Sequence, residues 1–194
     1  MENPQPILET SRLILRPLCQ DDIINIFTLG GDVDVASTTG LPHPYTEERA
    51  KDFVEKQARV YKDGECINFA ICAKDEDSAM DIGSTIGKLM GVIGLYLNLA
   101  NKRSELGYWL GKPFWGKGIT FESAKAVIKY GFKDLQLNRI YANHVTRNVA
   151  SGRIMKKLGL RFEGTFHQHI FKWGTSEDSE NYAILASEWQ KNEK

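Results

Sequence analysis

A short glycine-containing loop between a strand-like and a helix-like segment most restricts how this chain can fold. The loop reads Trp115-Gly116-Lys117-Gly118-Ile119-Thr120; it follows the apolar run 107–110 and precedes an amphipathic segment that begins near residue 121. Backbone N–H groups at a helix start, together with the helix dipole, suit an anion such as pyrophosphate. Glycine lets that anion approach the main chain without a Cβ in the way. Taken alone, such a pattern is more often an ordinary turn.

Hydrophobic periodicity and turn residues predict a mixed sheet with helices packed on its faces, an α/β fold. The expected strands are residues 13–17, 68–73, 89–97, 105–110, 138–145, 161–171 and 179–186. The expected helices are residues 21–27, 46–60, 120–135 and 148–158, with Thr46 as an N-cap and Gly159 as a C-cap. Residues 74–87 are polar and glycine-containing, which predicts an exposed hairpin loop. We expect a central twisted sheet of about seven strands, four flanking helices and a single domain over residues 1–194, with its core at about 8–188.

Composition removes several functional classes. The 194 residues include 25 Lys plus Arg and 25 Asp plus Glu, so no net charge draws the chain to nucleic acid or membrane. No apolar run approaches a membrane span, and the N-terminus lacks the pattern of a secretion signal. Three scattered cysteines without a C-x-x-C pair fit a reducing compartment, and no metal motif is present. We therefore expect a cytoplasmic protein that needs no metal and binds neither nucleic acid nor membrane.

Several short motifs follow one another along nearly the whole chain. They are TSRLILRP at 10–17, ELGYWL at 105–110, FWGKG at 114–118, NRI at 138–140, NVAS at 148–151 and KKLGLRFEG at 156–164. Each is modest alone, but in this order and spacing they resemble the RimJ/RimL-type branch of the GNAT N-acetyltransferase superfamily. The resemblance implies the GNAT fold. It also implies transfer of an acetyl group from acetyl-CoA to a primary amine, by direct attack in a ternary complex.

The same resemblance implies a donor site. The main chain of Tyr108, Trp109 and Leu110 is expected to pair with the amides of pantetheine, and Asn148 and Ser151 to lie beside its thiol end. The loop Trp115, Gly116, Lys117, Gly118, Ile119 and Thr120 is expected to bind the pyrophosphate. The superfamily loop has the form Gln/Arg-x-x-Gly-x-Gly/Ala. Here Trp115 holds its first place, Gly118 its fourth and Thr120 its sixth, so Thr120 departs from the small-residue rule.

The reaction needs a proton for the departing thiolate. Many GNAT enzymes use a tyrosine on the fourth helix, but the matching residue here is Met155, which cannot donate. Ser151, one turn earlier, is the replacement that the branch suggests, acting directly or through a water. The structural alternative makes Ser151 a first-turn residue of that helix, close to Asn148.

The reaction also needs a deprotonated amine. Candidate bases or water-orienting groups are Glu105, Asn143, His144, His167 and His169. A solvated strand end is the favoured interpretation of Glu105, and Asn143 can only orient a water. His167 and His169 are expected to alternate on one face of a strand, where each also fits the description of an exposed strand histidine.

The acceptor pocket is expected between the loop 43–45, the first two helices and the last two strands. Tyr45, His167 and His169 are its candidate residues, joined by the aromatic residues Phe166, Phe171 and Trp173. At pH 7 roughly a tenth of an α-amine is deprotonated, against about one lysine in 2,500. A protein N-terminus is therefore the favoured acceptor. A small amine such as an antibiotic, polyamine or amino acid stays open, as do a non-catalytic CoA-binding module and a homodimer.

Overall fold

The computed structural model describes residues 1, 4–83 and 85–192 of the 194-residue chain. Among these residues, eight strands form one mixed sheet in the order β1-β2-β3-β4-β5-β6-β8-β7. The strands are β1 (Leu8–Glu9), β2 (Leu13–Pro17), β3 (Cys66–Ala73), β4 (Leu89–Asn98), β5 (Arg103–Leu110), β6 (Arg139–Val145), β7 (Arg161–Lys172) and β8 (Thr175–Leu185). Neighbours run antiparallel except β5 and β6, which run parallel. The predicted mixed sheet is confirmed, and the two-residue β1 is an addition to it.

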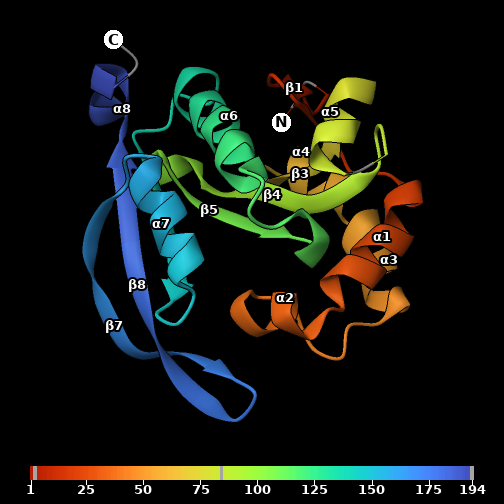
Figure 1. Cartoon of the computed structure of the whole chain (residues 1–194). Coiled ribbons are helices and arrows are strands. Elements are labelled where there is room, and N and C mark those ends of the chain that lie inside the picture. The colour runs from red at the N-terminus through yellow and green to blue at the C-terminus, as the bar shows by residue number, and fades with distance from the viewer. Residues whose placement is uncertain (2–3, 84, 193–194) are drawn as a thin grey trace.

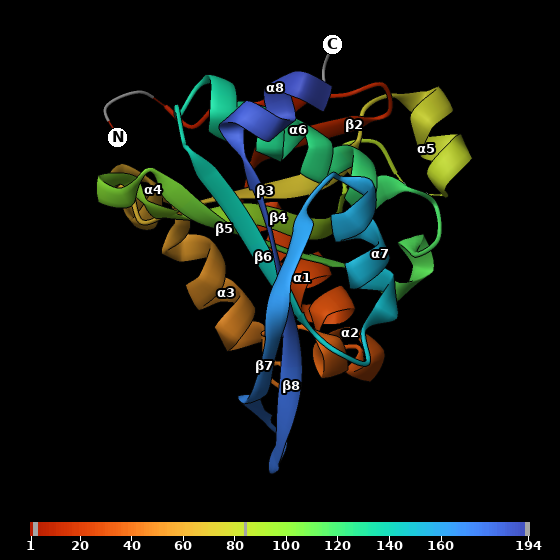
Figure 2. The same ribbon diagram turned by 90° about the vertical axis from the view of Figure 1, so that its left-hand side faces the viewer.

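Helices cover both faces of this sheet (Figures 1 and 2). They are α1 (Ile23–Gly30), α2 (Val33–Thr38), α3 (Glu47–Glu55), α4 (Gln57–Lys62), α5 (Glu76–Ile82), α6 (Ile119–Lys133), α7 (Val149–Lys157) and α8 (Ala186–Asn192). The helices α1, α2 and α3 pack on one face through Ile26, Val35 and Val54. On the other face, α6 buries Val127 and Ile128 completely, at the core-facing positions that its periodicity predicts.

One of the expected helices is divided, since residues 46–60 form α3 and α4 with Lys56 between them. The first expected helix is followed by a short helix that was not expected, α2. Thr46 caps α3 as predicted, because its side chain accepts a hydrogen bond from the backbone N–H of Arg49 at 3.3 Å. At the end of α7, Gly159 has φ of 85° and ends the helix as predicted.

The expected loop at residues 74–87 is wrong at its centre, where the chain forms α5. The Asp75 carboxylate caps this helix by accepting the backbone N–H of Ser78 at 2.8 Å. Glu76 and Asp77 in the first turn interact favourably with the positive end of the helix dipole. Gly83 ends the helix with φ of 63°. The polar composition that predicted a loop therefore belongs to a short capped helix.

The last two strands form a long hairpin that projects beyond the rest of the sheet (Figure 2). Trp173 and Gly174 connect them, with φ of 51° and 84°. The strand expected to reach Ala186 ends at Leu185, where α8 begins. Trp189 of α8 is buried beside the Phe132 ring of α6, at 6.1 Å between centroids, which holds the end of the described chain against the core.

The only parallel pair of neighbouring strands in the described sheet is short. The β5–β6 ladder consists of Arg103↔Arg139, Ser104↔Ile140 and Glu105↔Tyr141, after which the two strands are no longer paired. The second half of β5 leads through the glycine loop into α6, and the second half of β6 leads into α7. The ends of both strands and the starts of both helices therefore border one gap in the sheet.

Candidate active site

The second half of β5 directs backbone N–H groups into this gap. Gly111 donates its N–H to the carbonyl of Met90 on β4 at 2.9 Å. Successive N–H groups of a strand point in opposite directions, so those of Leu110 and Tyr108 point away from β4. β6 does not pair with β5 at these residues. Their N–H groups can therefore bind the carbonyl groups of an extended ligand lying in the gap.

The glycine loop lies where β5 ends and leads directly into α6. Gly116 and Gly118 both have φ of 76°, a left-handed conformation that favours glycine. Trp115 Nε1 donates to the carbonyl of Leu110 at 2.7 Å, which fastens the start of the loop to β5. The 15-residue α6 begins at Ile119, so its first N–H groups and the positive end of its dipole face the loop. This arrangement suits a pyrophosphate.

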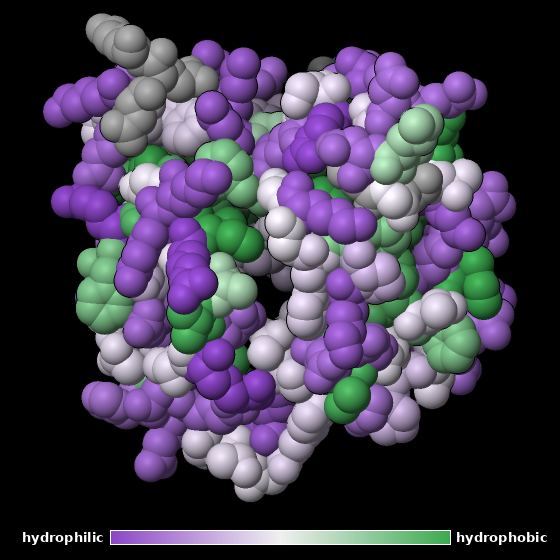
Figure 3. Space-filling model, viewed as in Figure 1, coloured by the Kyte–Doolittle hydropathy of each residue, from purple (hydrophilic) through white to green (hydrophobic). Residues whose placement is uncertain are grey.

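Two cavities meet beside the gap, and the surface is visibly hollowed at the centre of the face in Figure 3. The smaller, of about 590 Å³, is lined by the glycine loop and the start of α7. The larger, of about 740 Å³, is lined by α3 and by residues of β4, β5 and β6. Both are bordered by Thr38, Thr39, Tyr108, Trp109, Asn148 and Ser151. A ligand in one cavity can therefore meet a ligand in the other at these residues.

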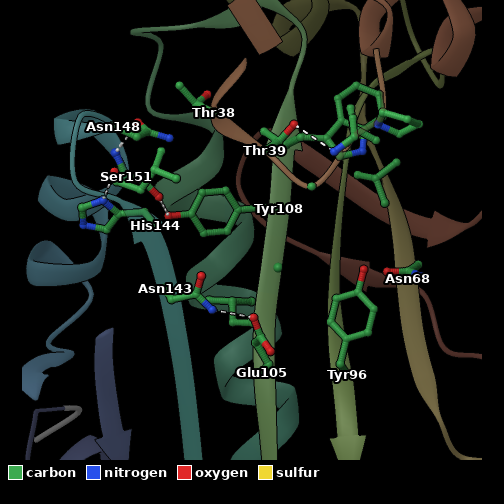
Figure 4. A pocket seen from close by; sticks show the side chains of 18 of the residues that line it. Thr38, Thr39, Asn68, Tyr96, Glu105, Tyr108, Asn143, His144, Asn148 and Ser151 are labelled. Atoms are coloured by element: carbon green, nitrogen blue, oxygen red, sulfur yellow. Dashed lines mark hydrogen bonds between the residues drawn. The ribbon is translucent and has the colours of Figure 1, made fainter. Parts of the chain in front are cut away.

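The junction of the cavities contains a pair of hydroxyl groups. The Tyr108 hydroxyl lies 2.6 Å from Ser151 Oγ, within hydrogen-bond distance (Figure 4). Burial raises the pKa of Tyr108 to about 12, although the bond to Ser151 acts in the opposite direction. At neutral pH the phenol therefore keeps its proton and can donate it. The Tyr108 hydroxyl is the functional group that the sequence did not indicate, since only its main chain was expected in the site.

The Asn148–Ser151 segment forms the capped start of α7, as the structural alternative predicted, and the catalytic role of Ser151 stays a prediction. Asn148 is the N-cap of α7, with its side chain accepting the Ser151 backbone N–H at 3.2 Å. Ser151 is thus a first-turn residue, and the cap leaves its hydroxyl directed at Tyr108. Met155, one turn later, is 1% exposed and belongs to the core that also lines the larger cavity. It supplies apolar packing where a proton donor was expected by resemblance.

Glu105 and Asn143 form a second polar pair, across the splayed strands (Figure 4). The Asn143 Nδ2 donates to Glu105 Oε1 at 2.8 Å, and both residues line the larger cavity. Glu105 is half-buried there rather than solvated at a strand end. Glu105 and Tyr108 are three positions apart on β5, so their side chains leave opposite faces of the strand. The carboxylate therefore lines only the larger cavity, whereas the hydroxyl pair borders both cavities.

His144, another candidate base, is buried against α7. Its Nδ1 lies 2.9 Å from the carbonyl of Val145, so this nitrogen carries a hydrogen. Its Nε2 lies 3.4 Å from a Glu180 carboxylate oxygen. Gly152 permits this packing, because a Cβ there would come within 2.7 Å of Nε2. His144 lines the larger cavity, and its Nε2 is buried without a hydrogen bond to any described residue.

His167 and His169 lie on the exposed hairpin and line neither of the two cavities. The β7–β8 register shifts between Phe166 and Ile170, where Gln168 has φ of 50°. This bulge breaks the expected alternation of the two histidines along a regular strand, and that prediction is wrong. His167 Nδ1 is 2.9 Å from Asp178, and the ring of His169 packs against that of Phe166.

Of the candidate residues for the acceptor pocket, Tyr45 lines the larger cavity. Its side chain is 8% exposed, and burial raises its pKa. The expected aromatic companions Phe166, Phe171 and Trp173 are at least half exposed on the hairpin and line neither cavity. Tyr45 is buried inside the α1–α3 layer, whereas the three other aromatic side chains are exposed on the hairpin. Sequence spacing alone could not separate these two positions.

Two cations that the sequence did not indicate connect the β7–β8 hairpin to the end of α2. Arg147 Nη2 donates to the carbonyl of Ser37 at 2.6 Å and also pairs with Glu177. Lys172 Nζ donates to the carbonyl of Thr39, and burial, followed by the nearby Arg147 charge, lowers the pKa of Lys172. Segments from the first and last parts of the chain, α2 and the β7–β8 hairpin, are therefore held together beside the cavities.

The expected donor-binding residues are brought together around the smaller cavity. Those that line it are Tyr108, Trp109, Leu110, Trp115, Gly116, Gly118, Ile119, Thr120, Asn148 and Ser151. Lys117 lies in the same loop between the two glycines. The gap-facing amides and the anion-binding loop fit the amide-bearing arm and the pyrophosphate of CoA respectively. Within residues 1, 4–83 and 85–192, no helix is both long and apolar enough to span a bilayer. The same residues contain no cluster of metal-ligating side chains.

Comparison with known proteins agrees with this geometry. The profile of the acetyltransferase (GNAT) domain matches residues 12–161. The uncharacterized N-acetyltransferase YoaA of Bacillus subtilis is 33% identical over 181 residues, 93% of this chain and 97% of that protein. The [ribosomal protein uS5]-alanine N-acetyltransferase of Escherichia coli is 32% identical over 84 residues, 43% of each chain. The RimL ribosomal L7/L12 α-N-protein acetyltransferase in complex with coenzyme A superposes with a TM-score of 0.81 at 19% identity, over 93% of this chain and 98% of that one. The chain therefore belongs to the GNAT family and is an acetyl-CoA-dependent N-acetyltransferase.

Proposed function

We propose that this enzyme acetylates a protein N-terminal α-amine by direct attack within a ternary complex. The observation that carries the proposal is the junction of the two cavities at Tyr108 and Ser151. Acetyl-CoA in the smaller cavity and the amine in the larger one can be present together. Their reacting groups can then meet without a covalent intermediate on the enzyme. The proposal treats residues 1–194 as one GNAT domain with its core at about 8–188.

The proton for the departing thiolate comes from Ser151 in this proposal. Either hydroxyl of the Tyr108–Ser151 pair can be the donor, and in this proposal the phenol of Tyr108, which burial keeps protonated to a pKa of about 12, donates to Ser151 Oγ. The serine hydroxyl hydrogen is then directed toward the thiolate. The amine nitrogen forms a bond to the acetyl carbon, the carbon–sulfur bond breaks, and the thiolate takes the Ser151 proton. Tyr108 is not expected to lose its proton permanently, since solvent restores the pair.

Glu105 accepts the proton that the amine releases, directly or through a water oriented by Asn143. The pair lies in the larger cavity, opposite the face of β5 from which Tyr108 reaches Ser151. The backbone N–H of Leu110 supports the reaction from the main chain, because a donor aimed into the gap stabilises negative charge on the acetyl oxygen. These roles give a base, an acid and a carbonyl-polarising group around one junction.

An α-amine is favoured over a lysine side chain because the cavity offers one half-buried carboxylate as its base. About a tenth of an α-amine is already deprotonated at pH 7, so such a base suffices. The Escherichia coli relative is named for acetylating an alanine of ribosomal protein uS5, which supports an acceptor of this class. The three cysteines are free thiols, in keeping with a cytoplasmic location.

The test is a CoA-release assay on an acceptor panel. N-terminal peptides with a free α-amine are compared with the same peptides blocked at the N-terminus but containing a lysine, and with polyamines, aminoglycosides and free amino acids. Ser151→Ala is the matched control for background thioester hydrolysis. Turnover with free N-terminal peptides alone supports the proposal. Preferred turnover of a small amine replaces it, and CoA binding without any turnover identifies a non-catalytic module.

A further inference from the structure

The N-terminal motif Thr10-Ser11-Arg12 has no role in the chemistry, yet it is tied to the donor site. Its target is Glu122, in the first turn of α6. Thr10 Oγ1, Ser11 Oγ and the Arg12 backbone N–H donate to Glu122 Oε1 at 2.6, 3.0 and 3.0 Å. Arg12 Nε donates to Oε2 at 2.9 Å. The Glu122 carboxylate thus binds a segment that lies 110 positions away in sequence and holds it against α6, the helix that follows the glycine loop.

The same Arg12 side chain reaches into the loop itself. Its Nη2 donates to the carbonyl of Lys117 at 3.1 Å, while Nη1 pairs with Asp81 at 2.7 Å. Lys117 lies between the two glycines with φ of 76°. Arg12 therefore connects the loop to the first turn of α6 through a single planar group, which a lysine cannot do because its ammonium has no second arm.

Holding the Lys117 carbonyl also sets the direction of the next N–H. In a trans peptide the C=O and the following N–H point in opposite directions. With the Lys117 oxygen turned toward Arg12, the Gly118 N–H points away from Arg12. Gly118 lines the smaller cavity and precedes the first residue of α6. On the other side of the loop, Trp115 is held by the Leu110 carbonyl, so the loop is fastened at both ends.

Charge gives a second reason for the arrangement. Glu122 stays ionised: burial acts to raise its pKa, but the hydrogen bonds from Thr10, Arg12 and Ser11 outweigh burial and lower it. An unpaired carboxylate one turn from an anion site repels a pyrophosphate. The Arg12 guanidinium offsets that charge, and its own pKa is raised by hydrogen bonds to Asp81 and Glu122.

We propose that Arg12 and Glu122 are positioning residues that hold the pyrophosphate loop of the acetyl-CoA site in its anion-binding conformation. They act through the Lys117–Gly118 peptide and through the start of α6. The inference depends on the donor site and is independent of the acceptor, so it can be tested by binding alone.

The test compares two ligands that differ at the pyrophosphate. Equilibrium binding of CoA and of pantetheine, which lacks the pyrophosphate and the nucleotide, is measured for the wild type, Arg12→Ala, Arg12→Lys and Glu122→Gln, together with the Tm of each free protein. We expect Arg12→Ala to weaken CoA about tenfold and leave pantetheine unchanged. Arg12→Lys restores only part of that loss. Glu122→Gln weakens CoA in the same selective way and serves where Arg12→Ala does not fold.

The control variant is Asp81→Asn, which removes the outer ion pair of Arg12 and leaves the contacts to Lys117 and Glu122. It is expected to bind both ligands as the wild type does. Equal weakening of CoA and pantetheine in the Arg12 and Glu122 variants overturns the proposal, because the cluster then supports the fold in general. Unchanged CoA binding in those variants also overturns it.

Discussion

The hydroxyl groups of Tyr108 and Ser151 lie 2.6 Å apart, although the residues are 43 positions apart in the chain. One comes from the second half of β5 and the other from the first turn of α7. Their bond crosses the gap where the sheet divides, and both residues border both cavities. We expect the two hydroxyl groups to act as one proton-donating unit, which substitution of either residue would break.

Tyr108→Phe and Ser151→Ala should each lower kcat by on the order of 10²-fold, the lower end of what a positioned acid contributes. The double variant should be little slower than either single one, because groups that act together are not additive. The measurement is kcat at saturating acetyl-CoA. Tyr130→Phe, at a buried tyrosine of α6 that lines neither cavity, is the control. Losses that multiply in the double variant would show that the two residues act separately.

The rate should rise with pH and stay high on the alkaline side. As pH rises, the acceptor amine loses its proton and becomes reactive, whereas the Tyr108 phenol keeps its proton until its pKa of about 12. With an α-amine acceptor, kcat/KM should therefore level off above about pH 8, near the amine pKa, and show no decrease up to about pH 10. A decrease between these values that disappears in Tyr108→Phe would contradict the protonated-donor role.

Gly118→Val should weaken acetyl-CoA binding by about tenfold or more. A side chain at φ of 76° costs on the order of 1–2 kcal/mol and alters the loop that faces the anion. Gly87→Val is the matched control, since Gly87 has φ of 69° and open space where a Cβ would lie. Both variants should lose similar unfolding free energy, measured in urea, but only Gly118→Val should lose donor affinity by calorimetry. Equal donor affinity in the two would remove Gly118 from the site.

Glu105→Gln should reduce kcat/KM for the acceptor while leaving the KM for acetyl-CoA unchanged. Asn143→Asp gives the sharper test, because it puts a second carboxylate at the 2.8 Å contact with Glu105. Two adjacent carboxylates cannot both ionise readily, so one pKa of the pair rises. The acidic limb of the kcat/KM profile should then move upward by on the order of one pH unit. An unmoved limb would mean that another group accepts the proton.

His169→Ala should distinguish acceptor classes. His169 lies outside the larger cavity, next to Ile170, which lines it. A protein acceptor extends out of the cavity past the hairpin and can contact this side chain, whereas a small amine stays inside. We expect a raised KM for an N-terminal peptide of about ten residues and an unchanged KM for a small amine. His43→Ala, on the loop that packs against Trp173, is the comparison variant, because His43 also lies near the end of the hairpin.

Local signals predicted the parts of the fold that depend on neighbouring residues. The Thr46 cap, the Gly159 end of α7 and the period of α6 are all readable within one or two turns of helix. The helix α5 carries the same kind of signal in Asp75, which its polar composition obscured. The expected donor site came from the resemblance to GNAT enzymes, and its segments 108–110 and 115–120 are nearly contiguous in sequence.

Contacts between distant segments could not be predicted in this way. The Tyr108–Ser151 bond depends on where the parallel ladder stops, and that point is set by the packing of two strands and two helices. The bulge at Gln168 interrupts the regular strand between His167 and His169, because β7 has more residues than β8 between the pairs Phe166↔Ser179 and Ile170↔Glu177. Nothing in the sequence indicated that the Glu122 carboxylate accepts hydrogen bonds from the Thr10–Arg12 motif.

The ladder between β5 and β6 ends after three residue pairs. The second half of β5 therefore has no strand paired to it on the β6 side. The N–H groups of Tyr108 and Leu110 point away from β4 and are not paired with β6, and we expect the carbonyl groups of acetyl-CoA to accept hydrogen bonds from them. Stability then becomes a function of metabolite concentration. At a hundred times its dissociation constant, a ligand adds about 2.7 kcal/mol to the unfolding free energy. We therefore expect the supply of acetyl-CoA to influence the lifetime of this protein as well as its turnover.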